Sequence, residues 1–358
     1  MKVGLQPILS DSHLDANQPS SQRQLSISIA SVSEGDERLP LNLCLVLDHS
    51  GSMEGQPLKT VKQAAISLVE KLTPSDRLSV VAFDHRAKTI VPNQPVEDIS
   101  AICWPIERLK ADGGTAIDEG INLGLEEAAK GQRDATSQVF LLTDGENEHG
   151  DNKRCLRLAE FASEHNVTLN ALGFGKHWNQ DVLERIADTA SGTLSYIEEP
   201  DRAIDEFGRL FKRAQSVGLT NAYLVLELAP QVRLAELKPV AQVAPDTIEL
   251  PVLNEGGQFA VRLGDLMTEE RVVLANLYIG QLSSGTQLIA TVQVRYDDPA
   301  SGQQGLLCDP IPVYAEVQPV YNPAPDGRVQ KDILALAKYR QTQIAETKLQ
   351  QGDRTGAA

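Results

Sequence analysis

Residues 41–52 read LNLCLVLDHSGS, and this stretch decides the fold. Its first seven residues form an almost unbroken apolar run, which is typical of a strand covered on both faces of a sheet. The run ends in Asp48, Ser50 and Ser52, which alternate in a short glycine-containing loop. Oxygen-bearing side chains directly after a buried strand indicate a binding site at the carboxyl edge of a sheet. The residues that follow, with Pro57 near the first turn, predict a helix.

Strands and helices alternate from this stretch to about residue 216. We expect further strands at 78–83, 138–142, 167–174 and 193–197, and further helices at 115–130, 153–165, 181–190 and 201–215. Alternation of this kind predicts a mostly parallel sheet with helices on both faces, which is a doubly wound α/β fold.

The flanking segments have a different period. Residues 25–29 alternate apolar and polar, as a half-buried strand does. After residue 217 the helical period disappears, and short strands are expected at 223–228, 258–263, 271–278, 287–296 and 306–317. Strands at this spacing predict an antiparallel β-sandwich. We expect the two N-terminal strands to join it, which makes the α/β domain an insertion between sandwich strands.

The chain ends with an amphipathic helix, expected at 328–350. Its apolar side carries Val329, Ile333, Leu336, Ile344 and Leu349. This helix either caps the sandwich or begins a longer helical region. The expected domain bounds are 1–39 and 217–325 for the sandwich, 40–216 for the α/β domain and 326–358 for the C-terminal helix.

Composition limits the partners. The 358 residues include 33 Lys and Arg against 49 Asp and Glu, a net charge of -16. This balance disfavours nucleic acid and anionic membranes but suits a protein that collects a cation. No stretch approaches the 18 apolar residues of a membrane span, and the N-terminus lacks a signal-peptide core. Four well-separated cysteines without a C-x-x-C pair predict reduced thiols and a cytoplasmic protein.

Two further pieces join the loop after residue 47. Residues 112–115, DGGT, open a predicted helix, and residues 143–146, TDGE, follow a predicted strand. Ligands of open α/β sheets sit beyond the carboxyl ends of the strands, so these pieces are expected to converge. Hydroxyl and carboxylate oxygens are ligands of hard cations. The sequence therefore predicts one divalent cation, Mg²⁺ by preference and Ca²⁺ or Mn²⁺ as alternatives, held by Asp48, Ser50, Ser52, Thr115 and Asp144.

These residues resemble the von Willebrand factor A family. Residues 48–52 fit the D-x-S-x-S element of its metal-ion-dependent adhesion site, and Thr115 and Asp144 fit its separate Thr and Asp. The resemblance covers about 40–216. It implies that Ser50, Ser52 and Thr115 contact the metal directly, that Asp48 and Asp144 act largely through water, and that a partner protein's Asp or Glu fills the open position.

The broader arrangement is similar to inter-alpha-trypsin-inhibitor heavy chains and to bacterial chloride-channel-like proteins. In the family's low-affinity state, the resemblance implies that Asp144 binds the metal directly and that the Thr115 contact lengthens. Each of these changes would be a two-state element that a ligand can bias.

The predicted function is adhesion-type protein–protein recognition without turnover. One alternative is a metal-dependent phosphoryl hydrolase with Asp48 as nucleophile, although that chemistry normally has a second acid where this chain has Ser50. Another is a regulatory or scaffold subunit of an ATPase or channel-like assembly. A local alternative for Thr115 is that it serves as the N-cap of its helix and does not bind a metal. His85 and His149 lie in loops that are expected to border the metal crevice.

Overall fold

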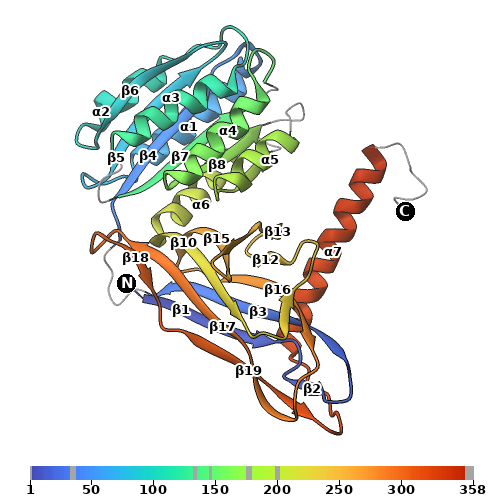
Figure 1. Ribbon diagram of the computed structural model, residues 1–358. Coiled ribbons are helices and arrows are strands. Elements are labelled where there is room, and N and C mark those ends of the chain that lie inside the picture. The colour runs from blue at the N-terminus through green and yellow to red at the C-terminus, as the bar shows by residue number, and fades with distance from the viewer. Residues whose placement is uncertain are drawn as a thin grey trace. The chain divides into compact units, whose positions relative to one another are not determined.

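The structure, a computed structural model (Figure 1), describes residues 2–32, 38–131, 135–144, 147–174, 180–197 and 202–350. The chain divides into two compact units. We call residues 35–220 and 298–304 the α/β unit, and residues 1–34, 221–297 and 305–358 the sandwich unit. The α/β unit is thus inserted into the sequence of the sandwich unit, which confirms the predicted architecture.

The α/β unit is built on one sheet of six strands in the order β6-β5-β4-β7-β8-β9. The strands are β4 (Leu41–Asp48), β5 (Arg77–Phe83), β6 (Ala87–Pro95), β7 (Thr136–Thr143), β8 (Val167–Phe174) and β9 (Leu194–Ile197). All neighbours pair in parallel except β6, which is antiparallel to β5. Counted along the chain, the order is 3-2-1-4-5-6, so the prediction of a doubly wound sheet is confirmed.

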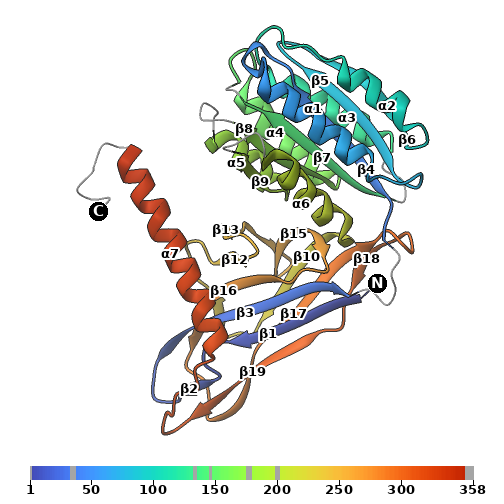
Figure 2. The same ribbon diagram turned by 180° about the vertical axis from the view of Figure 1, so that it is seen from behind.

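Alternate residues of β4 face two separate cores. Leu43 and Leu45 pack with α1 (Gln56–Val69), α2 (Ile99–Glu107) and α6 (Ala203–Gln215). On the opposite face, Cys44 and Val46 pack with α3 (Ile117–Ala129), α4 (Asn152–Glu164) and α5 (Gln180–Thr189). Figures 1 and 2 show these two helix layers from opposite sides. Because both faces of β4 are covered, its sequence is apolar at nearly every position.

Two sheets make up the sandwich unit. One has the order β1-β3-β16-β12-β13, with β11 paired to β16. Its strands are β1 (Lys2–Leu9), β3 (Ser20–Val32), β11 (Val232–Leu234), β12 (Val240–Ala244), β13 (Ile248–Glu249) and β16 (Arg271–Gly280). The other has the order β14-β15-β10-β17-β19-β2, with β18 paired to β17. Its strands are β2 (His13–Asp15), β10 (Val217–Leu228), β14 (Val252–Glu255), β15 (Gln258–Met267), β17 (Gly285–Asp298), β18 (Gln303–Leu307) and β19 (Ile311–Gln318).

The pairs β1–β3, β3–β16, β14–β15 and β17–β19 are antiparallel, as predicted, whereas β2 runs parallel to β19.

The C-terminal helix α7 (Gly327–Gln350) packs against the first sheet of the sandwich unit. Val329 and Leu336 are buried against Leu274 and its neighbours. Ile344, which the sequence places on the same apolar side, is 55% exposed, so the packed face of the helix is shorter than predicted. Among the helices of the described residues, none is long and apolar enough to cross a membrane.

Candidate metal centre

The end of β4 holds Asp48 in a fully enclosed position. Its side chain is 0% exposed. One carboxylate oxygen accepts a hydrogen bond from the Ser50 amide (2.8 Å), and the other accepts one from the Thr143 hydroxyl (2.6 Å). Burial raises the pKa of Asp48 to about 6, because the hydrogen bonds from Ser50 and Thr143 offset only part of the loss of hydration. Sequence analysis did not single out Thr143, which orients this carboxylate from the neighbouring strand.

A chain of hydroxyl and carboxylate oxygens leads away from Asp48. After Ser50 the backbone makes a short 3-10 turn, Gly51–Met53. In this turn the Ser50 and Ser52 hydroxyl oxygens lie 3.1 Å apart, and the Ser52 hydroxyl donates to an Asp144 carboxylate oxygen at 2.7 Å. Burial raises the pKa of Asp144, and the Ser52 hydrogen bond opposes that rise. Four predicted site residues are thus linked by direct hydrogen bonds.

The oxygen spacing of this chain fits a small cation. Neighbouring ligands of an octahedral Mg²⁺ at about 2.0–2.1 Å lie roughly 2.9 Å apart, whereas Ca²⁺ at about 2.3–2.6 Å separates them by roughly 3.3–3.7 Å. The two separations, 2.7 and 3.1 Å, are those of ordinary hydrogen bonds, so these oxygens already lie close enough together to share one small cation. Within the described residues, no group of three His, Cys, Asp or Glu side chains is arranged to hold a metal. A cation bound there would therefore need the serine and threonine hydroxyls.

Thr115 joins the group through the backbone. It is buried, at 4% exposure, in the segment that precedes α3. The Gly51 amide donates to the Gly113 carbonyl (3.0 Å), and the Asp112 amide donates to the His49 carbonyl (2.9 Å). These contacts hold the segment beside the Asp48 loop. The N-cap of α3 is Ala116, so the alternative that Thr115 is itself the cap is wrong.

Two glycines let imidazole rings pack against the Thr115 segment. Gly113 has φ +74°, and a Cβ there would lie 2.6 Å from a ring nitrogen of His85. A Cβ on Gly114 would collide with the ring of His149. His85 and His149 therefore flank the segment that leads to Thr115, and their place at the border of a metal crevice stays a prediction.

The topology explains why these pieces converge. Counted along the chain, the strand order reverses between β4 and β7, the neighbouring parallel strands that end in Asp48 and Thr143. In open α/β sheets the crevice at this reversal, beyond the carboxyl ends, is where ligands bind. The candidate centre therefore lies where the fold provides a ligand site.

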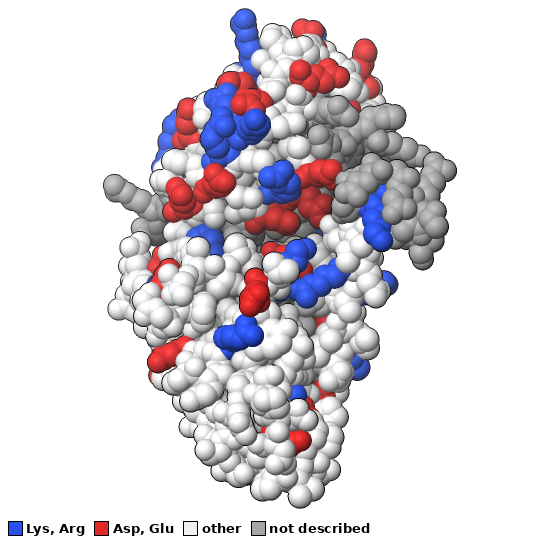
Figure 3. Space-filling view, turned by 45° about the vertical axis from the view of Figure 1, so that its right-hand side comes forward, with Lys and Arg blue, Asp and Glu red and all other residues white. Residues whose placement is uncertain are grey.

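Charge on the surface is mixed. On the face drawn in Figure 3, the described Lys, Arg, Asp and Glu side chains are most frequent on the α/β unit, where both signs are interspersed. No continuous basic stripe crosses the described atoms of this face. Such a stripe is the usual electrostatic footprint of nucleic-acid binding.

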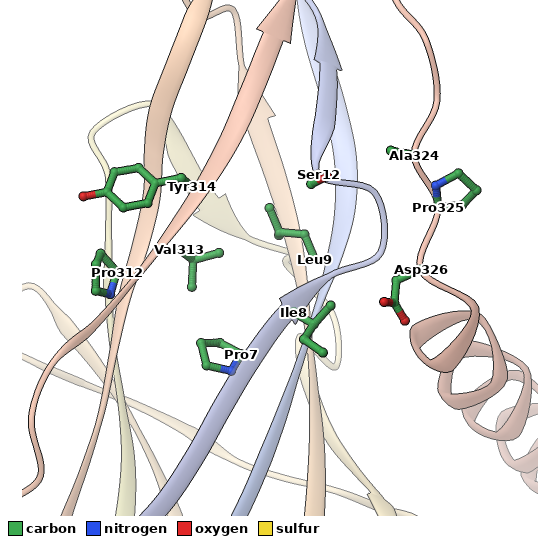
Figure 4. Close-up of a pocket in the computed structure, with 10 residues that line it drawn as sticks. All are labelled: Pro7, Ile8, Leu9, Ser12, Pro312, Val313, Tyr314, Ala324, Pro325 and Asp326. Carbon is green, nitrogen blue, oxygen red and sulfur yellow. The ribbon is translucent and has the colours of Figure 1, made fainter.

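A separate pocket of about 350 Å³ lies in the sandwich unit (Figure 4). Pro7 of β1 and Pro312 of β19 line it, and a proline interrupts the row of N–H donors that an added strand would need. The carboxylate of Asp326, also in the lining, already accepts hydrogen bonds from the Arg328 and Val329 amides. The pocket thus has a mixed polar and apolar lining, and its carboxylate is already held by these two amides.

Comparisons with known proteins identify the family. The model of the von Willebrand factor type A domain matches residues 42–208, and that of the Sll0103-like, C-terminal alpha-helical domain matches residues 327–358. The chain is 62% identical over 360 residues to the uncharacterized protein sll0103 of Synechocystis, a match that covers 100% of this chain and 86% of that protein. The chain belongs to the von Willebrand factor type A family.

Other relatives of this von Willebrand A protein extend the likeness. It is 28% identical over 195 residues to inter-alpha-trypsin inhibitor heavy chain H1 of Mesocricetus auratus, which covers 51% of this chain and 21% of that protein. The predicted likeness to those heavy chains is therefore confirmed. The solved structure of a von Willebrand factor type A protein from Catenulispora acidiphila aligns with a TM-score of 0.80 at 18% identity, over 98% of this chain and 82% of that chain. At this identity, the match shows a shared fold.

Proposed function

We propose that the α/β unit binds a partner protein through one divalent cation, Mg²⁺ by preference. The residues that would hold it are Asp48, Ser50, Ser52, Thr115 and Asp144. The observation that best supports this proposal is that the side-chain oxygens of Ser50, Ser52 and Asp144, from two separate segments, meet in one hydrogen-bonded chain beside the buried Asp48. Hydroxyl ligands are neutral, so most of the cation's charge would remain to attract a carboxylate of the partner.

The position of Asp48 favours binding over hydrolysis. A nucleophilic carboxylate needs an oxygen that can reach the substrate. Asp48 is fully buried, and each of its oxygens already accepts a hydrogen bond, from Ser50 or from Thr143. Its role in this proposal is to orient the Ser50 loop and to supply negative charge behind the cation.

The thiols support the expected cytoplasmic location. All four cysteines are free. Burial raises the pKa of Cys44 and of Cys155 to about 12, so neither thiol is readily ionised or oxidised. Free, inert thiols are compatible with a reducing compartment.

Calorimetric titration tests the cation step. The full chain, stripped with EDTA, is titrated separately with Mg²⁺, Mn²⁺ and Ca²⁺, and we expect one ion per chain. Ser52→Ala removes one ligand oxygen and the hydrogen bond to Asp144, and we expect it to weaken affinity by about tenfold or more. Ser100→Ala, at an exposed position in α2, is the matched control and should bind as the wild type does.

Acetate tests the carboxylate step. With Mn²⁺ bound, acetate should displace a metal-bound water and lower the paramagnetic relaxation of bulk water protons, whereas chloride at equal ionic strength should not. No ion uptake by the wild type, or uptake without an acetate effect, contradicts the proposal. Mg²⁺-dependent hydrolysis of p-nitrophenyl phosphate that Asp48→Ala abolishes would establish the hydrolase instead.

A further inference from the structure

The side chain of Asn147 connects the loop after β7 to the first turn of α3. Its amide oxygen accepts a hydrogen bond from the backbone N–H of Ile117 at 2.7 Å. Its amide nitrogen donates to the Asn152 side-chain oxygen at 3.0 Å, which fixes the orientation of the amide group. Asn147 lies three residues after Asp144, and Ile117 lies two residues after Thr115. The contact therefore joins the two segments that carry these predicted metal-site residues.

Helix α3 depends on this contact because its own cap is weak. The N-cap residue, Ala116, has no side-chain hydrogen-bond acceptor, and the first amides of any helix lack intrahelical partners. Asn147 supplies the acceptor from another part of the chain. A second contact, from the His149 amide to the Thr115 carbonyl (2.9 Å), lies beside it. The helix start and the Asp144 loop thus share two hydrogen bonds.

Gly150 makes room for this arrangement. A Cβ at this position would collide with the side-chain oxygens of both Asn147 and Asp118. Asp118, in the first turn of α3, also pairs with Arg154 of α4 at 2.9 Å. Gly150 is therefore packed tightly against Asp118 and Asn147, which limits the positions that Asn147 can adopt.

We propose that Asn147 is a positioning residue of the metal centre, which keeps Thr115 and Asp144 at the separation that one cation requires. This inference rests on the function proposed above. Asn147 itself would not touch the metal. Without its side-chain oxygen, residues 147–150 and the start of α3 would lose one of their two hydrogen bonds and keep the one from the His149 amide, and the two ligands could drift apart. Small misplacements of supporting residues commonly reduce metal affinity 10- to 100-fold.

Two variants of Asn147 separate acceptor loss from general damage. Asn147→Leu keeps the size but removes the acceptor for Ile117, and we expect Mg²⁺ affinity to fall by about tenfold or more. Asn147→Asp restores an acceptor at a helix N-terminus, where a negative charge is also favourable, and should recover affinity to near the wild-type value. If Asn147→Leu does not fold, Asn147→Ser, too short to reach Ile117, replaces it.

Asn152 provides matched controls. Asn152→Asp adds the same charge nearby without changing the Ile117 contact, so it reports how much of any recovery is electrostatic. Asn152→Ala removes one of the two hydrogen bonds that the Asn147 amide nitrogen donates, the other going to Cys155 Sγ at 3.6 Å, and should lower thermal stability without lowering Mg²⁺ affinity by more than about twofold. A purely structural role would instead make affinity losses follow stability losses across all variants.

Amide hydrogen exchange gives a readout that needs no metal. In the EDTA-treated protein, the Ile117 amide should exchange faster in Asn147→Leu than in the wild type, and at the wild-type rate in Asn152→Asp. Wild-type affinity in a folded Asn147→Leu variant, or an unchanged Ile117 amide, overturns the positioning role and leaves the metal site standing. A wild-type chain that takes up no cation overturns the proposed function itself.

Discussion

Replacing Asp48 by Asn is predicted to stabilise the metal-free protein while abolishing metal binding. Asp48 is fully buried, and burial raises its pKa from 3.8 to about 6, with the charge of Asp144 adding to the shift. In the unfolded chain the carboxyl ionises near pH 4, whereas in the folded protein it keeps its proton to about pH 6. Stability therefore falls as pH rises across this window. At about 1.4 kcal/mol per pKa unit, ionised Asp48 costs about 3 kcal/mol above pH 6.

Urea unfolding in EDTA between pH 4 and pH 8 measures this cost. Because a chain with two units need not unfold in one step, the transition to follow is the one that Mg²⁺ shifts in the wild type. Asparagine keeps an acceptor for the Ser50 amide, and the Thr143 hydroxyl can turn to accept from its nitrogen. The two proteins should be about equally stable near pH 4, and Asp48→Asn about 3 kcal/mol more stable at pH 7. Mg²⁺ should stabilise only the wild type.

The comparison with Asp48→Asn removes the contribution of other acids, since both proteins share them. Glu54→Gln, in the exposed turn after the Ser50 loop, is a matched control whose difference from the wild type should stay small at every pH. A constant difference between Asp48→Asn and the wild type from pH 4 to pH 7 would refute the reasoning. It would mean that water or a neighbouring group compensates the buried charge.

Two further predictions concern the frame of the α/β unit. Burial alone would raise the pKa of Asp76, but hydrogen bonds from Arg38 and from backbone amides lower it. Asp76→Asn should therefore lower the free energy of unfolding by about 2–3 kcal/mol at pH 7. The difference in unfolding free energy between this variant and the wild type should shrink as the pH falls below 4, because Asp76 of the wild type then takes up a proton. Urea unfolding at pH 7 and below pH 4 measures this change. Gly192→Ala should destabilise by about 3 kcal/mol or more, because a Cβ there collides with the rigid carbonyl of Leu169. Its control in the same thermal melts is Gly208→Ala in α6, where the nearest atom is 3.7 Å away and a gain of about 0.5–1 kcal/mol is expected. Equal effects of the two alanines would contradict the steric argument.

The fold could be predicted where one local signal was enough. The apolar run of β4 indicated a doubly covered strand, and burial on both faces confirms it. The periodicity of the sequence did not predict β6 or α2. The first is a partly exposed edge strand that pairs antiparallel to β5, and the second contains Pro105 within nine residues. Prolines and edge positions weaken periodicity, so tertiary packing decided these elements.

One predicted strand, 306–317, is divided in the structure. β18 ends at Leu307 and β19 begins at Ile311, and Pro310 lies between them. A single residue without an N–H can end a pairing that the apolar pattern alone would continue. The bounds of such elements depend on individual backbone groups, which composition and periodicity do not resolve.

The candidate site was predicted from the topology of the sheet more than from the periodicity of the sequence. Because parallel strands end at one edge, Asp48 and Asp144 were expected to meet, and the Ser50–Ser52 chain links them. The sequence did not predict the hydrogen bond from the Thr143 hydroxyl to Asp48, or the one from the Ile117 amide to Asn147. An asparagine just past an Asp-Gly pair is a usual capping residue, but the amide that it caps belongs to α3, thirty residues away in sequence. Its partner depends on how the helix packs.

The insertion of the α/β unit has a mechanical consequence. The chain leaves the sandwich after β3 and returns in β10, and each of these strands has a neighbour on both sides, in different sheets. Any force applied to the α/β unit would therefore reach both sheets of the sandwich unit, through strands that are hydrogen-bonded on each side.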